Sequence, residues 1–149
     1  MKGGVSKLIF LLILSSYLFA CNGHHDRPFG GFSSESPEYK ALSFFQANYN
    51  TNDFDTMLAL SSVKYQQTIQ AYQSPNSFSR YLLNLQYDQG VDINIDRSFS
   101  EITSKTGDRT SVTILFTGHN HGRKIKELKR VLFIKEQNKW LINDIEPVV

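Results

Sequence analysis

Residues 91–96, Val-Asp-Ile-Asn-Ile-Asp, mark the point at which the periodicity of the chain changes. Val91, Ile93 and Ile95 alternate with polar residues, which is the period of a β-strand with one buried face. Before Gly90, apolar residues recur every three or four positions, as they do along one face of a helix. The chain of 149 residues therefore places helices first and strands second, within a length typical of one domain.

Four helices are expected before Gly90. The first begins at Ser36-Pro37-Glu38, where serine caps the helix, proline fits the first turn and the acid suits the positive end of the dipole. The caps of the other three are Asn52 or Asp53, Ser61 or Ser62, and Ser74. Their apolar faces are Ala41, Leu42, Phe45 and Tyr49; Phe54, Met57 and Leu58; Tyr65, Ile69 and Tyr72; and Phe78, Tyr81, Leu82 and Leu85.

Four strands are expected after the helices. The first runs from Val91 to Phe99, and a bulge or bend is expected near Ser100-Glu101 because Ile102 is out of phase. The others centre on Val112–Phe116, Lys124–Lys135 and Trp140–Ile142, with a turn at Gly118–Gly122 and an end at Pro147. Helices followed by an antiparallel meander predict an α+β fold in which N-terminal helices pack on a curved antiparallel sheet.

The N-terminus has the layout of a secretory signal peptide. Lys2 and Lys7 precede an apolar run, Leu8–Leu14, and small Ala20 stands before Cys21. The apolar stretch from residue 8 to residue 20 is shorter than the roughly 20 residues that a membrane span needs. Residues 1–20 are therefore expected to be a cleaved signal peptide rather than a retained transmembrane anchor.

Leu18-Phe19-Ala20-Cys21 resembles the lipobox of bacterial lipoprotein precursors. In that family a diacylglycerol is attached to the cysteine sulfur and a peptidase cuts before the cysteine, so the resemblance implies a lipid anchor on Cys21. Phe19 departs from the family pattern, which usually has a small or β-branched residue there. Cys21 is also the only cysteine of the chain, and a thioether removes the liability of an odd thiol in an exported protein.

Residues 21–35 form the next expected segment, a flexible tether. Gly, Pro, Ser and polar residues dominate it and no period is visible. His24 and His25 could bind a metal, but adjacent histidines in a linker are weak evidence for a site, and solvated linker residues are the favoured interpretation. By the rule borrowed from the lipoprotein family, Asn22 implies the outer membrane, facing the periplasm. Residues 36–149 remain as the single folded domain.

The charge balance excludes a strongly basic protein. Residues 1–20 carry two lysines and no acid, and without them basic and acidic residues are equal in number. A nucleic-acid binder normally shows a basic excess. We therefore expect no nucleic-acid partner, and the expected partners are the membrane, through Cys21, and an envelope protein.

The segments Pro37–Leu60 and Asn138–Ile145 resemble the nuclear-transport-factor-2-like superfold, a cone of helices wrapped by a bent sheet. The resemblance covers residues 36–146. More narrowly, the domain is similar to small bacterial lipoproteins of unknown function that have this fold. Its relatives include enzymes, ligand binders and interaction modules. Enzymes of the superfold usually hold an Asp–His or similar pair inside the cone, but residues 36–89 contain no histidine. Their acids, Asp53, Asp55 and Asp88 among them, stand at expected caps or helix ends.

The segment 118–130 holds the other polar candidates. His119 and His121 form a His-x-His pair, which could bind zinc only with a third ligand; an exposed polar turn explains them without one. Residues 123–130 include five basic residues, which could face anionic lipid heads or an acidic partner, or simply form the solvated face of a strand. No catalytic residue, metal site or cofactor is predicted.

Five aromatic residues could line a ligand cavity inside the cone, or fill it as core. They are Phe45, Tyr49, Tyr81, Phe116 and Trp140. Two functions follow from these alternatives. The first is a membrane-anchored envelope lipoprotein with a non-catalytic binding or scaffolding domain; the second is a small-molecule binder or enzyme that uses the cavity.

Overall fold

The computed structural model describes residues 31–97 and 107–148. Cys21, most of the expected tether and the bend expected near Ser100-Glu101 lie outside the described residues. The helical part comprises α2 (Pro37–Gln46), η2 (Ala47–Thr51), α3 (Phe54–Ala59), α4 (Val63–Ala71), α5 (Pro75–Ser77) and η3 (Phe78–Leu82).

The capping residues expected from the sequence are confirmed. The side chains of Ser36, Asp53, Ser62 and Ser74 each accept a hydrogen bond from a backbone N–H in the first turn of the helix that follows. The hydroxyl and the N–H of Thr56 hold the pKa of Asp53 below its usual value. Each of the four described α-helices therefore begins at a side chain that satisfies one of its free N–H groups, whereas η2 and η3 have no such cap.

Two segments are wound more widely than the sequence predicts. Residues 37–51 form one continuous helical stretch, but its last part, η2, is π-helical and ends at Asn52, which is left-handed with φ 54°. The segment η3 is also π-helical. A π-turn inserts an extra residue and rotates the side chains that follow it. Apolar positions assigned from the ordinary helical period therefore shift near these turns.

The sheet is an antiparallel meander in the order β1-β2-β3-β4, and its strands are β1 (Asp92–Ile95), β2 (Arg109–Asn120), β3 (Arg123–Glu136) and β4 (Lys139–Pro147). The expected turn at Gly118–Gly122 is wrong, because β2 continues to Asn120 and pairs with Arg123. Only His121 and Gly122 form the turn, both with positive φ, 49° and 72°. A register shift between Leu132 and Phe133 interrupts the pairing of β3 with β4.

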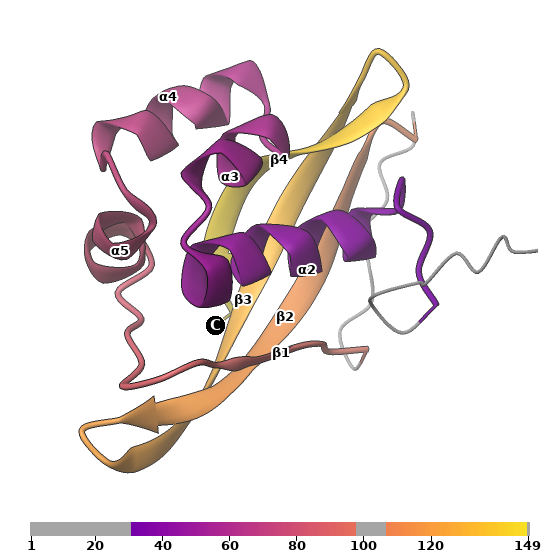
Figure 1. Ribbon diagram of the computed structural model, residues 1–149. Helices are drawn as coiled ribbons and strands as arrows, with labels where there is room; N and C mark the ends of the chain where they lie inside the picture. The colour runs from indigo at the N-terminus through magenta and orange to yellow at the C-terminus, as the bar shows by residue number, and fades with distance from the viewer. Residues whose placement is uncertain (1–30, 98–106, 149) are drawn as a thin grey trace, which may run out of the picture.

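Figure 1 shows the helices gathered on one face of the sheet, with α2 lying across the strands. The end of the β2–β3 hairpin extends past the helices, at the lower left of the view (Figure 1). The predicted α+β fold, with helices packed on an antiparallel sheet, is confirmed. Within residues 31–97 and 107–148, no helix is long and apolar enough to cross a membrane.

The core lies between α2 and the inner face of the sheet, the face that the helices cover. Its largest fully buried side chains include Phe44, Phe45, Phe78, Phe116 and Phe133. The link between α3 and α4 is joined to β4, because Ser62 N donates to Ile142 O at 2.8 Å and Ile142 N donates to Leu60 O at 3.0 Å. Among residues 31–97 and 107–148, the buried core residues lie between Ala41 and Ile142. A chain that begins at Asn22 therefore keeps all of these residues.

Candidate functional site

Three of the five aromatic candidates meet in the interior. The rings of Phe45 and Phe116 are fully buried and stand edge to face, with their centroids 4.7 Å apart. Tyr49 lies 5.8 Å from Phe116, and its hydroxyl donates to the carbonyl of Leu85 at 3.1 Å. Burial raises the pKa of Tyr49, so the phenol stays neutral. These rings pack against one another as core side chains do.

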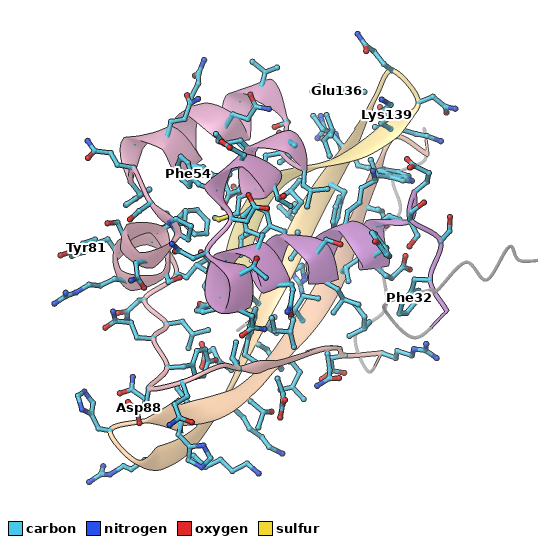
Figure 2. The ribbon with its side chains drawn as sticks, in the orientation of Figure 1. Phe32, Phe54, Tyr81, Asp88, Glu136 and Lys139 are labelled. Carbon is cyan, nitrogen blue, oxygen red and sulfur yellow. The ribbon has the colours of Figure 1, made fainter. Side chains whose placement is uncertain are left out.

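The other two candidates lie elsewhere. Tyr81 on η3 is 67% exposed, with the guanidinium of Arg80 5.4 Å from its ring centroid, and it points away from the body (Figure 2). The prediction that Tyr81 lines an interior cavity is wrong, because the π-turn of η3 buries Phe78 and turns Tyr81 outward. Trp140 on β4 is half-buried, and the ammonium of Lys135 lies 5.4 Å from its ring centroid.

A buried polar contact joins the two π-turns. Asn48 of η2 donates to the hydroxyl of Ser79 of η3 at 2.7 Å, and that hydroxyl donates to the carbonyl of Pro75 at 3.0 Å. The side-chain oxygen of Asn48 is buried without a hydrogen-bond partner. The contact is neutral throughout and offers no acid–base pair, so it serves to position η3 against η2.

A second group of polar contacts forms where residues 86–90, here called the strap, cross the end of the β2–β3 hairpin. Both carboxylate oxygens of Asp88 accept backbone hydrogen bonds of 2.9 Å, one from His121 and one from Gly122. The N–H of Asp88 donates to the carbonyl of His119 at 2.8 Å. Asn120 Nδ2 donates to the carbonyl of Gln86 at 3.0 Å. Figure 2 shows Asp88 beside the hairpin turn.

These contacts correct the interpretation of Asp88. The sequence places it near the end of a helix, where capping would account for it, yet its partners are 33 and 34 residues away. The N–H groups of Gly122 and His121 lower its pKa. No local signal around residue 88 indicates this role, because the partner turn is set by the pairing of β2 with β3.

Tyr87 of the strap packs against the inner face of the sheet. Its ring lies directly on Gly118, so closely that a Cβ there would stand 2.8 Å from Tyr87 Cε1. The ring also lies 5.4 Å from the ring of Tyr49. Burial and the nearby carboxylate of Glu127 raise the pKa of Tyr87. Gly118 thus belongs to the strand and is needed for the close approach of Tyr87 rather than for a turn.

A shallow hollow of about 250 Å³ lies beside the strap and is lined by Asp88, Gln89, Gly90 and His119. His119 is exposed at the end of β2, and His121 is exposed in the turn. Among residues 31–97 and 107–148, no three His, Cys, Asp or Glu side chains come together in a way that could hold a metal ion.

The structure divides the basic run of residues 123–130 into two parts. Lys129 is paired with Glu127 at 3.4 Å, and Arg130 is paired with Glu146 at 3.2 Å. The remaining three, Arg123, Lys124 and Lys126, are exposed, and no ion pair joins them to a carboxylate of the described chain. We call these three residues the basic hairpin end.

Replacing Asp88 by alanine is expected to loosen the hairpin turn. Hydrogen exchange at the amides of His121 and Gly122 should accelerate by about tenfold, because both lose a charge-assisted bond. Since the folded pKa of Asp88 is lowered, the protection it gives is complete above the ordinary aspartate range. In the wild type that protection should disappear as the pH falls through the lowered pKa.

The control for this prediction is Asp92→Ala, which removes an exposed acid from β1. Exchange at the two turn amides should not change in this variant. Equal protection of both amides in wild type and Asp88→Ala would contradict the role assigned to the strap.

Comparison with known proteins adds information on the fold. No protein-family model and no curated protein sequence matches the chain. The solution structure of a SEC-C motif containing protein from Rhodopseudomonas palustris superposes with a TM-score of 0.57 at 17% identity, covering 79% of this chain and 83% of that chain. This likeness shows a shared fold. A crystal structure of an NTF-2 like protein of unknown function from Shewanella oneidensis has a TM-score of 0.43 at 11% identity, covering 73% of this chain and 100% of that chain.

Proposed function

We propose that the protein is an envelope lipoprotein, anchored by lipid on Cys21, whose domain binds or scaffolds without catalysing a reaction. The lipobox-like segment 18–21 supports the anchor. The ring contacts of Phe45 with Phe116 support a filled interior rather than a reaction chamber. This edge-to-face contact between two fully buried rings carries the non-catalytic part of the proposal.

The proposal divides the chain into a signal peptide at residues 1–20, a tether at 21–35 and one domain at 36–149. The domain belongs, on this proposal, to the nuclear-transport-factor-2-like superfold. Asn22 after the lipidated cysteine places the protein on the outer membrane, facing the periplasm. The binding surface is the β2–β3 hairpin, since its end carries exposed cations without ion-pair partners among the described residues.

A lipid-labelling experiment tests the anchor. The full precursor is expressed in a bacterium fed a radioactive or clickable fatty acid, and Cys21→Ala is compared with the wild type. Label should be lost completely and the precursor should stay uncut, because the sulfur that receives the diacylglycerol is missing. A Cys21→Ala chain that is cut at the same bond and is equally membrane-bound would refute the lipoprotein proposal.

Phe19→Ala provides the matched control in the same segment. Alanine restores the small residue that the lipobox pattern usually has at that position, so label and cleavage should equal or exceed those of the wild type. Loss of label in this variant would show that the segment is processed by some other rule.

A further inference from the structure

The end of the β2–β3 hairpin combines charge and apolar side chains on one face. Val112, Ile114 and Phe116 of β2 are buried toward the helices, so the residues between them lie on the outer face of the sheet. The register places three pairs there in succession, namely His119 with Lys124, Thr117 with Lys126 and Leu115 with Leu128. Both lysines are exposed, and both leucines are half-buried.

The acids near the hairpin offset only part of this charge. Asp88 accepts hydrogen bonds from the turn N–H groups and keeps its own negative charge, so one acid at the turn stands against three cations, while the carboxylate of Glu127 is paired with Lys129. Asp92 lies on β1 opposite Thr117, with the width of β2 between it and Lys126. The cations at the very end of the hairpin therefore face solvent, and this end extends past the helices (Figure 1).

We propose that the basic hairpin end docks the domain on anionic lipid headgroups. Lys124 and Lys126 lie on the outer face beside Leu115 and Leu128, and Arg123, whose position alternates to the other face, adds its charge directly at the turn. Lysines beside half-exposed leucines match a surface of anionic headgroups over acyl chains, where the ammonium groups stay among the phosphates. Each Lys or Arg held near such a surface strengthens binding about fivefold.

The structure favours a membrane over an acidic protein as the occupant. Protein interfaces usually depend on a few large anchors such as Trp or Tyr that fill pockets on the partner. The large apolar side chains that are well exposed in the described chain are Val63 and Tyr81, and both lie on the helical part. This inference rests on the proposed function, in which the tether of residues 21–35 joins the domain to lipid on Cys21. Such a tether keeps the domain within at most about 50 Å of a membrane.

The test uses the chain that begins at Asn22, which lacks the proposed signal peptide and Cys21 but keeps the buried core residues that the structure describes. Its partitioning is measured by sedimentation with vesicles of phosphatidylcholine that contain about 30% phosphatidylglycerol, and with vesicles of pure phosphatidylcholine. Wild type should bind the anionic vesicles alone and release them in about 1 M salt. Arg123→Gln, Lys124→Gln and Lys126→Gln combined should weaken binding about 100-fold.

A second triple variant controls for net charge. Lys64→Gln, Arg109→Gln and Lys139→Gln remove the same charge from exposed positions, and Lys139 begins β4 at the opposite end of the sheet (Figure 2). This variant should keep its affinity within about twofold, because Arg109 and Lys139 lie at the end of the sheet opposite the β2–β3 turn and Lys64 lies on α4, so salt screens these charges from a membrane bound at the hairpin end.

Three outcomes would overturn the proposal. They are equal binding to neutral and anionic vesicles, equal loss in the two triple variants, and binding to immobilised polyglutamate without binding to vesicles, which would assign an acidic protein partner instead. None of them affects the labelling of Cys21 in the precursor, since the tested chain has no cysteine. Failure of the lipid surface and failure of the anchor are therefore distinguishable.

Discussion

Replacing Phe116 by alanine is expected to destabilise the domain by about 3–5 kcal/mol, the usual cost of deleting a buried aromatic ring. Phe116 is fully buried on the central strand β2 and touches the rings of both Phe45 and Tyr49, at 4.7 and 5.8 Å between centroids. Alanine leaves a void between α2 and the sheet that neither the strand nor the helix can close. Urea unfolding of the chain beginning at Asn22 measures the effect.

Tyr81→Ala is the matched control, since it removes an aromatic ring of similar size from the surface. Its free energy of unfolding should stay within about 0.5 kcal/mol of that of the wild type. A loss below about 1 kcal/mol for Phe116→Ala would contradict the filled interior. That outcome would favour the alternative function, a small-molecule binder or enzyme with a cavity inside the cone.

Replacing Gly118 by alanine is expected to destabilise the domain by about 1–3 kcal/mol, the usual cost of overpacking. Elsewhere in a strand, alanine would stabilise the chain relative to glycine by about 0.5–1 kcal/mol. At this position the added Cβ meets the ring of Tyr87, only 2.8 Å from its Cε1, so the ring and the strap must move. The free energy of unfolding and the exchange of the strap amides measure the two parts of the effect.

A double-mutant cycle with Tyr87→Ala separates this clash from other causes. Tyr87→Ala alone should be destabilising, because the ring packs on Tyr49 with centroids 5.4 Å apart. In the Tyr87→Ala background, Gly118→Ala should then cost almost nothing. The same cost of Gly118→Ala in both backgrounds would show that Tyr87 is not the reason for the glycine.

The features that were predictable from the sequence are those that depend on neighbouring residues. The capping side chain of Ser36 bonds to a backbone N–H only three residues away, and the alternation of Val91, Ile93 and Ile95 expresses the pleat of one strand. The change of period at Gly90 predicts the order of helices and strands for the same reason. The N-terminal lipobox-like segment is also local, so the proposed anchor rests on the sequence alone.

The candidate site was less predictable because its contacts join distant segments. The partners of Asp88 lie across the hairpin turn, and Gly118 is explained only by Tyr87, 31 positions before it in the chain. Tyr81 turned outward because a π-helical turn displaced the expected face. None of these facts leaves a periodic or capping signal near the residue concerned.

The sequence by itself determined the helix-then-strand order and where most elements begin, because backbone propensity and capping act over a few residues. Tertiary structure alone decided which aromatics fill the interior and which cations of residues 123–130 remain without an acid. Strand register brought Glu146 to Arg130, which no local pattern indicates, whereas the pairing of Glu127 with Lys129, two positions apart, follows from alternation along β3 itself. The basic hairpin end keeps an excess of positive charge because the single carboxylate at the β2–β3 turn, that of Asp88, stands against three cations, and Glu127 is paired with Lys129.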